Sequence, residues 1–251
     1  MVKPVKSRLD ELLVRRGIAD SISTARAFIM SGDVIVNDQR IDKSGSMVDD
    51  DAKIRLRTDG KFVSRGGDKL EAAIEDLGLG ADFKNKVVLD IGASTGGFTD
   101  CVLFYGAKKV LALDVGTAQL DWKLRQDPRV VSIEKTDIKE FDSSSHPEID
   151  WAVADVSFTS LAKLVPHIKK SAPKAKILIL VKPQFELPRE LVPPGGIIAR
   201  EEDRQLALKQ VKDALMTEMY QIENEIDCRV PGRQGNREIF ILAAPKISNY
   251  N

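Results

Sequence analysis

The sequence contains little cysteine and little histidine, and this scarcity excludes two kinds of site. Two cysteines, Cys101 and Cys228, and two histidines, His146 and His167, occur among 251 residues. Disulfide scaffolds and metal sites need paired or closely grouped ligands, and these four residues are scattered along the chain. We therefore expect neither a disulfide framework nor a bound metal.

Long hydrophobic runs are also missing. The longest aliphatic run covers residues 177–181, which is far shorter than a membrane span. Met1 to Pro4 leads directly into a charged segment, without the apolar core of a secretory signal. We therefore expect a cytoplasmic protein with no membrane partner.

An overall charge of one sign is missing as well, because 38 Lys and Arg residues balance 38 Asp and Glu residues. Nucleic-acid binding would therefore have to come from a local patch. One candidate is the first thirty residues, whose basic side chains outnumber the acidic ones by three. The same excess could equally belong to a solvated helix face.

The N-terminal part of the sequence predicts a compact unit of helices followed by short strands. Residues 7–31 have the apolar spacing of two short helices. A strand is expected at Val34–Val36, followed by a turn at Asn37-Asp38. We assign this small α+β domain to residues 1–60, with its boundary near residues 58–62.

Beyond that boundary, strands alternate with helices. Apolar strand runs occur at residues 87–91, 110–113, 130–133, 151–154 and 177–181. Near-continuous apolar strands separated by helices indicate a parallel sheet that is covered on both faces. A long amphipathic helix at 201–219 then precedes a closing strand pair at 222–228 and 239–243. The expected fold class for residues 61–251 is α/β with a Rossmann-like sheet, and residues 61–68 are the linker region.

A glycine-rich turn at residues 90–97 follows the first of these strands and opens a helix. Such a turn brings backbone N–H groups close to a ligand, although a purely structural turn has the same composition. A dinucleotide site would need a glycine at the position of Ser94, whose side chain would obstruct a pyrophosphate.

Two carboxylates favour an adenosine cofactor without phosphates. Asp114 ends the next strand, where it can accept hydrogen bonds from both ribose hydroxyls, and Asp137 follows the third strand. Each alone would more often be a helix cap, but together they point to S-adenosylmethionine. The candidate cofactor-binding residues are Asp90, Gly92, Ala93, Ser94, Gly96, Gly97, Phe98, Asp114 and Asp137.

Charged residues also stand where a parallel sheet presents its ligand-binding edge. Lys69 lies ahead of the first strand, and Glu238 lies in the loop between the last two strands. Asp155 and Lys182 each follow a strand. Five aliphatic residues precede Lys182, so its ammonium must sit at the carboxyl end of that strand, although a lone lysine there would more often be a snorkelling surface residue.

Together these motifs resemble the TlyA family, whose members are named both as hemolysins and as ribosomal RNA 2′-O-methyltransferases. The N-terminal part is similar to the RNA-binding module of ribosomal protein S4, through Arg8-Leu9-Asp10, Gly17, Ala25-Arg26, Gly32 and Val34 to Asn37. The rest resembles FtsJ-type ribose methyltransferases, and the motif matches place their Lys–Asp–Lys–Glu tetrad at Lys69, Asp155, Lys182 and Glu238. One departure is that residues 193–196 lack a lysine often found before the glycine pair.

The resemblance implies methyl transfer from S-adenosylmethionine to a ribose 2′-oxygen of a cytidine in ribosomal RNA. Lys182 would accept the hydroxyl proton as a neutral amine. Because the reference pKa of lysine is about 10.4, desolvation or a nearby cation such as Lys69 would have to favour that neutral form. Asp155 and Glu238 favour the charged form instead, so their role would be to orient Lys182 and to balance charge. The expected partner is ribosomal RNA or a ribosomal subunit, without an obligate protein partner, and the candidate RNA-binding residues are Arg8, Arg15, Arg16, Arg26 and Arg65.

Two other functions remain as alternatives. A membrane-lytic protein would fit the hemolysin name, but the sequence shows no signal peptide, spanning segment or strongly amphipathic apolar stretch. A catalytically inactive RNA-binding protein would also keep the fold. The intact tetrad argues against that alternative, because an inactive protein has no need of all four charged residues.

Overall fold

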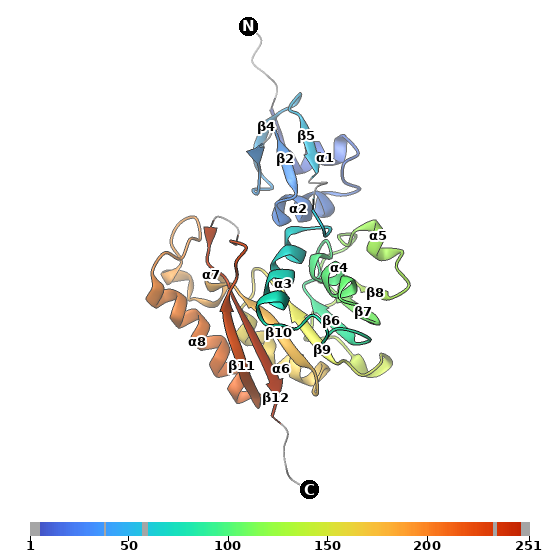
Figure 1. Cartoon of the computed structure of the whole chain (residues 1–251). Coiled ribbons are helices and arrows are strands. Elements are labelled where there is room, and N and C mark those ends of the chain that lie inside the picture. The colour runs from blue at the N-terminus through green and yellow to red at the C-terminus, as the bar shows by residue number, and fades with distance from the viewer. Residues whose placement is uncertain (1–5, 38, 57–59, 233–234, 247–251) are drawn as a thin grey trace.

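The structure is a computed structural model that describes residues 6–37, 39–56, 60–232 and 235–246. Within these residues the chain forms a small N-terminal unit and a larger α/β unit (Figure 1). The expected turn at Asn37-Asp38 and the expected boundary near residues 58–62 lie partly outside the described residues.

The N-terminal unit packs two helices against short antiparallel strands. Its elements are β1 (Lys6–Arg8), α1 (Leu9–Arg15), α2 (Ile22–Ser31), β2 (Val34–Val36), β3 (Gln39–Arg40), β4 (Met47–Asp49) and β5 (Ile54–Leu56). Strands β3, β2 and β5 form one sheet in that order, and β1 pairs with β4. Helix α2 begins where the Ser21 hydroxyl accepts a hydrogen bond from the backbone N–H of Thr24 (3.1 Å). The two predicted helices and the strand that follows them are therefore present.

The α/β unit is built on a seven-stranded sheet. Its strands are β6 (Val87–Ile91), β7 (Lys109–Leu113), β8 (Val130–Ile133), β9 (Trp151–Ala154), β10 (Lys176–Val181), β11 (Tyr220–Asp227) and β12 (Ile239–Pro245). They lie in the order β11-β12-β10-β9-β6-β7-β8. Strands β6 to β10 pair in parallel, whereas β12 is antiparallel to both β10 and β11. The predicted Rossmann-like α/β fold with a closing strand pair is confirmed.

The strand order reverses beside β6. The chain runs from β6 outward to β7 and β8, then returns to the other side of β6 to form β9 and β10. Ile91 at the end of β6 pairs with Leu113 of β7 and with Ala154 of β9, so the three carboxyl ends lie at one edge. Open α/β sheets bind ligands outside this edge at the point of reversal. The topology therefore predicts a ligand crevice at the ends of β6 and β9.

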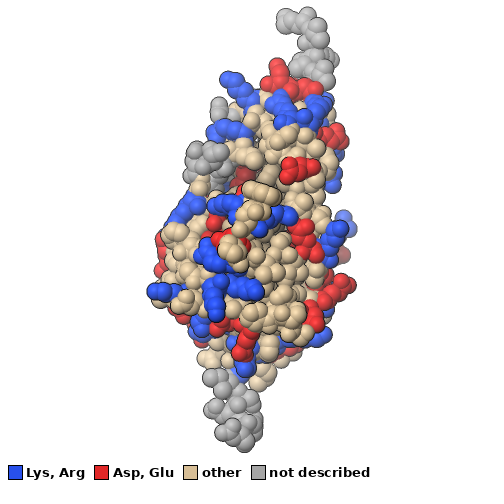
Figure 2. Space-filling view, turned by 90° about the vertical axis from the view of Figure 1, so that its right-hand side faces the viewer, with Lys and Arg blue, Asp and Glu red and all other residues tan. Residues whose placement is uncertain are grey.

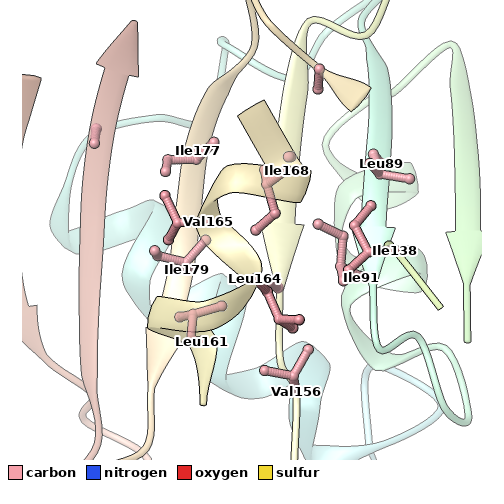
Figure 3. Close-up of a cluster of buried hydrophobic side chains, with 14 of the residues drawn as sticks. Leu89, Ile91, Ile138, Val156, Leu161, Leu164, Val165, Ile168, Ile177 and Ile179 are labelled. Carbon is pink, nitrogen blue, oxygen red and sulfur yellow. The ribbon is translucent and has the colours of Figure 1, made fainter. Parts of the chain in front are cut away.

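Helices cover both faces of the sheet. The longer covering helices are α3 (Arg65–Asp76) and α4 (Gly97–Phe104) on one face, and α6 (Leu161–Ser171) and α8 (Glu201–Thr217) on the other. In Figure 3, Val165 of α6 points toward Ile177 and Ile179 of β10. The short helices α5 (Trp122–Arg125) and α7 (Pro183–Glu186) lie in connecting loops. Among the described residues, no helix combines the length and apolarity needed to cross a membrane.

Two of the four covering helices were missed by the sequence analysis. Helix α3 contains Gly66 and Gly67 in its first turn, and α6 contains Pro166, and these residue types have low helix propensity. Burial of one apolar side overrides that propensity in both helices. Helix α8 also ends earlier than expected, because Met219 adopts a left-handed conformation (φ 58°) and β11 starts directly after it.

Adjacent glycines in α3 provide a test of how closely it packs. A Cβ atom on Gly67 would lie 2.4 Å from Cβ and Cγ of Phe62, whereas one on Gly66 would come no closer than 3.4 Å to Ser64 Oγ. We expect Gly67→Ala to lower the free energy of unfolding by about 1–3 kcal/mol through overpacking. Gly66→Ala should leave it unchanged or raise it by up to about 1 kcal/mol. Urea denaturation measures both, and equal effects would contradict the packing described.

Candidate active site

A cleft of about 870 Å³ opens at the carboxyl edge of the sheet, where the strand order reverses. The N-terminal unit supplies one of its walls, through the end of α2 and the loop between β3 and β4. Beside this wall, the Thr24 hydroxyl donates a hydrogen bond to the backbone oxygen of Ala118 (2.7 Å), which joins the two units. A cleft of this size accommodates a ligand as large as an adenosine derivative.

The glycine-rich turn forms part of the cleft between β6 and α4. Gly92, Ser94 and Gly96 have left-handed backbone conformations (φ 79°, 49° and 96°). A Cβ atom on Gly96 would lie 2.3 Å from a side chain of α5, and one on Gly97 would lie 2.3 Å from Ser64 Oγ. Both positions therefore need glycine. The predicted cofactor residues of this turn that line the cleft are Gly92, Ala93, Ser94, Gly97 and Phe98, and Gly96 is not among the described lining residues.

The two acidic residues predicted after β7 and β8 both line the cleft. The Asp114 carboxylate accepts hydrogen bonds from the backbone N–H groups of Ser94 (2.8 Å) and Gly116 (2.7 Å), which holds it beside the glycine-rich turn. The Asp137 carboxylate accepts a hydrogen bond from the backbone N–H of Lys139 (3.0 Å). Because a carboxylate offers about four acceptor positions, both residues can still accept hydrogen bonds from a ligand.

Asp90, the remaining predicted cofactor residue, lies behind the turn and is not among the described residues that line the cleft. Its Oδ2 accepts a hydrogen bond from the Thr99 hydroxyl (2.6 Å), and its Oδ1 is buried without a partner among the described residues. Burial disfavours the charged form and, with the nearby Asp155 and Asp114 carboxylates, raises the pKa of Asp90 to about 7. Asp90 is therefore an interior carboxyl that titrates near neutral pH.

The structure brings the four predicted catalytic residues to the cleft as two ion pairs. Lys69 of α3 pairs with Glu238 (Nζ–Oε2 2.6 Å). Lys182 at the end of β10 pairs with Asp155 at the end of β9 (Nζ–Oδ1 2.6 Å). Lys69, Lys182 and Glu238 are buried, and the Asp155 side chain is 21% exposed. Charges from four distant parts of the sequence therefore meet in one place with little access to water.

Burial and charge oppose each other in this cluster. Burial by itself would lower the pKa of Lys69, but the Asp155 and Glu238 carboxylates outweigh it and hold that pKa above its ordinary value. Burial would likewise raise the pKa of Asp155, but Lys182 and Lys69 outweigh it and hold that pKa below its ordinary value. Lys69 is thus a permanent cation at neutral pH, and Asp155 is ionised beside Lys182.

The loop before β12 holds Glu238 through two residues to which the sequence analysis assigned no role. The buried Asn236 side chain accepts a hydrogen bond from the Ile198 N–H (2.8 Å) and donates one to the Gly196 oxygen (2.7 Å), which ties two loops together. A Cβ atom on Gly232 would lie 2.5 Å from Glu238 Oε1, so glycine leaves room for the carboxylate. Asparagine and glycine are common in loops, and so their presence in the sequence carried no signal.

Two residues after β9 were also missed. The Lys182 ammonium donates a hydrogen bond to Ser157 Oγ (2.9 Å). Phe158 is 74% exposed at the cleft, and its ring centroid lies 5.3 Å from that of Phe185. The sequence did contain a signal for Ser157, because side chains two residues apart in an extended segment point to the same side, here Asp155 and Ser157.

The predicted RNA-binding arginines of the N-terminal unit all make contacts within that unit. Arg8 (Nη2–Oδ2 2.7 Å) and Arg26 (Nε–Oδ2 2.9 Å) both bind the buried carboxylate of Asp10. The Arg8 guanidinium, joined by Arg26, outweighs burial and holds the pKa of Asp10 below its ordinary range. Arg15 and Arg16 contact the loop between β4 and β5. These contacts leave part of each guanidinium free, because the group carries five N–H donors.

The fifth predicted arginine, Arg65, lies in the cleft itself. It donates a hydrogen bond to the backbone oxygen of Pro231 (2.9 Å) in the loop before β12. Figure 2 shows Lys and Arg side chains on the N-terminal unit and a further group of them near the middle of the same face. Although the chain carries no net charge, these basic side chains form local groups on this face, with Asp and Glu side chains near them.

The fold and the cleft define a class of protein. A doubly wound sheet with an antiparallel strand beside β10, a glycine-rich turn after β6 and an acidic residue after β7 are features of the methyltransferase fold. The model of the FtsJ-like methyltransferase family matches residues 62–245, and the S4 domain model matches residues 7–54. The class is that of FtsJ-like methyltransferases with an S4 domain.

Three similar proteins narrow the family. Hemolysin A of Brachyspira hyodysenteriae is 41% identical over 92% of this chain and 97% of its own length. The 16S/23S rRNA (cytidine-2'-O)-methyltransferase TlyA of Mycobacterium tuberculosis is 37% identical over 94% of this chain and 89% of its own length. A solved structure named "Putative hemolysin from Streptococcus thermophilus" is 35% identical, with a TM-score of 0.73, over 98% of this chain and 90% of that one. The chain belongs to the TlyA family of FtsJ-like methyltransferases.

The raised pKa of Asp90 predicts a pH dependence of stability. Between the ordinary pKa of 3.8 and about 7, the folded protein holds a proton that the unfolded chain has lost. The free energy of unfolding should therefore fall as pH rises through this window. Asp90→Asn cannot ionise and should flatten this decline, whereas Asp82→Asn, which removes an exposed carboxyl, should not. Urea denaturation between pH 4 and pH 8 measures the slope, and an unchanged slope in Asp90→Asn would refute the assignment.

Proposed function

We propose that this chain transfers the methyl group of S-adenosylmethionine to the 2′-oxygen of a ribose in ribosomal RNA, with a cytidine as the target. The observation that supports this proposal most directly is that two ion pairs, Lys69–Glu238 and Asp155–Lys182, line the same cleft. The name of one relative supports the reaction class, since the similar protein of Mycobacterium tuberculosis is a 16S/23S rRNA (cytidine-2'-O)-methyltransferase.

The half of the cleft at the ends of β6, β7 and β8 fits the cofactor. The turn backbone and the side chains of Asp114 and Asp137 line this half. Asp114 would hold the ribose hydroxyls, and Ser94 stands where a dinucleotide would require glycine. When bound, S-adenosylmethionine supplies an electrophilic methyl group on a sulfonium. The residues present therefore fit an adenosine ligand without phosphates.

The half of the cleft at the ends of β9 and β10 and the start of β12 fits the acceptor ribose. A 2′-hydroxyl is a weak nucleophile until its proton leaves, and Lys182 would accept that proton. Asp155 holds the Lys182 side chain in place by their ion pair. Lys69, which is held by Glu238, carries a positive charge, and this charge disfavours a second positive charge on Lys182. Holding the oxygen in line with the methyl group would account for much of the remaining rate.

The N-terminal unit would dock the RNA. The S4 domain match covers residues 7–54, and we assign RNA binding to residues 1–60 and catalysis to residues 61–251, in which helix α3 begins at Arg65 within the expected linker region 61–68. Arg8, Arg15, Arg16 and Arg26 are candidate phosphate contacts on this unit, and Arg65 is one at the cleft. Because the unit forms a wall of the same cleft, RNA bound to it would lie beside the catalytic residues.

The first test concerns the cofactor. Asp114→Asn should weaken binding of S-adenosylhomocysteine by about 1–3 kcal/mol, because hydrogen bonds to a charged group are lost. Asp121→Asn is the matched control, since Asp121 also accepts a backbone hydrogen bond (from Lys123, 2.9 Å) but does not line the cleft. Calorimetry on the full chain measures both. Tight binding of NAD, or unchanged affinity in Asp114→Asn, would contradict the assignment.

The second test concerns the proton acceptor. Lys182→Ala should reduce methyl transfer by about 10²–10⁴-fold while cofactor and RNA affinities stay near wild type. Lys182→Arg should fail as well, because a guanidinium stays protonated. Lys176→Ala is the control, since Lys176 begins the same strand and pairs with Glu223 (3.2 Å) at the far end. Mass mapping of ribose methylation in ribosomal RNA measures all three, and full activity of the Arg variant would overturn the proposal.

A further inference from the structure

The chain leaves β9 as an extended segment that presents two polar side chains to Lys182. Asp155 and Ser157 point to the same side, while Val156 between them is buried in the core. The Asp155 backbone N–H donates a hydrogen bond to the Ile91 oxygen (3.1 Å), which anchors the segment to β6. Phe158 then adopts a left-handed conformation (φ 65°) and ends the extended run. Ser157 is thus held in place from both sides.

The Lys182 amine has an ion-pair partner and a hydrogen-bond acceptor. Asp155 Oδ1 lies 2.6 Å from Nζ, and Ser157 Oγ lies 2.9 Å from it. Lys182 is only 8% exposed, and its Nζ makes no third hydrogen bond or ion pair with the described residues. Both Lys182 and Ser157 line the cleft. Two polar groups of the protein, the Asp155 carboxylate and the Ser157 hydroxyl, therefore already contact the nitrogen.

The geometry of an amine links this arrangement to the direction of the Lys182 lone pair. A neutral lysine amine has two hydrogens and one lone pair, arranged tetrahedrally with the carbon. We propose that Ser157 is a positioning residue: Asp155 and Ser157 accept the two hydrogens, so that the lone pair of Lys182 points to the remaining position, where the ribose hydroxyl binds. This inference rests on the proposed function, in which Lys182 is the proton acceptor.

The same arrangement suits the amine after proton transfer. As the oxygen–methyl bond forms and the sulfur–methyl bond breaks, the hydroxyl proton passes to the Lys182 lone pair, the sulfonium charge is lost and an ammonium results. The two original hydrogens remain on Asp155 and Ser157, so no acceptor has to move during the reaction. Groups already oriented for the product charge lower the barrier, because they need no reorganisation at that moment.

Removing the serine hydroxyl should affect orientation more than binding. In Ser157→Ala, Asp155 still holds one hydrogen, but the lone pair can take either of two positions. We expect kcat to fall about 2- to 10-fold, the range for one lost hydrogen bond, while KM for RNA and the affinity for S-adenosylhomocysteine stay unchanged. Ser157→Thr keeps the hydroxyl, and the exposed position leaves room for the added methyl group. The kcat of this variant should therefore stay within about twofold of the wild-type value.

A neighbouring serine provides the matched control. Ser160 donates a hydrogen bond of similar length to Glu186 (2.7 Å), whereas the hydrogen bond and the ion pair of Lys182 are made with Ser157 and Asp155. Ser160→Ala should therefore keep the wild-type kcat even if it lowers thermal stability. Should Ser157→Ala fail to fold, Ser157→Cys keeps the side-chain size with a weak acceptor and should show the same fall in kcat.

A crystal structure supplies a readout that does not depend on activity. In Ser157→Ala the Lys182 Nζ should occupy more than one position, and in Ser157→Thr a single one. If Lys182→Ala is inactive, two results would overturn the role of Ser157. One is a wild-type kcat in Ser157→Ala, and the other is a reduced kcat in a correctly folded Ser157→Thr variant. Full activity of Lys182→Ala would instead overturn the proposed function itself, so the two failures are distinguishable.

Discussion

Parallel hydrogen bonding among β6, β9 and β10 is the constraint on which the site depends. It brings the carboxyl ends of strands from distant parts of the chain to one edge, which is where Asp155 and Lys182 lie. The antiparallel pairing of β12 with β10 adds the third charge, and helix α3 supplies the fourth, Lys69. Val181 pairs with Ile239, so the next residues in register are Lys182 and Glu238. Sheet register therefore decides which charges meet.

Burying these charges carries a cost that the rest of the fold must offset. Transferring an ion from water to the protein interior costs several kcal/mol. The attraction between two buried ions seldom exceeds the combined cost of transferring both. The two ion pairs satisfy the charges locally, while apolar cores on both faces of the sheet supply the stability. This arrangement adds little stability, yet it holds Lys69 charged and Asp155 ionised beside Lys182. A role in catalysis explains it better than a role in stabilising the fold.

The N-terminal unit takes part in the same cleft. Residues at the end of α2 and in the loop between β3 and β4 face the glycine-rich turn, and Thr24 binds the loop that follows β7. Within the N-terminal unit, Asp10 ties Arg8 of β1 to Arg26 of α2, so arginines proposed for RNA also hold the unit together. Recognition and chemistry thus share one opening in the molecule.

Much of this protein could be predicted from its sequence, because apolar runs of parallel strands and the backbone needs of a glycine-rich turn are local properties. Helix α3 was not predictable in this way, since its paired glycines, Gly66 and Gly67, have low helix propensity that packing overrides. Asp155 and Lys182 were visible as charged residues at strand ends, and the tetrad as a whole was assigned through its resemblance to FtsJ-type methyltransferases. Its pairing, the burial of Asp90 and the contact of Ser157 with Lys182 were decided only by strand order, register and the face that each side chain takes, and these depend on the whole sheet.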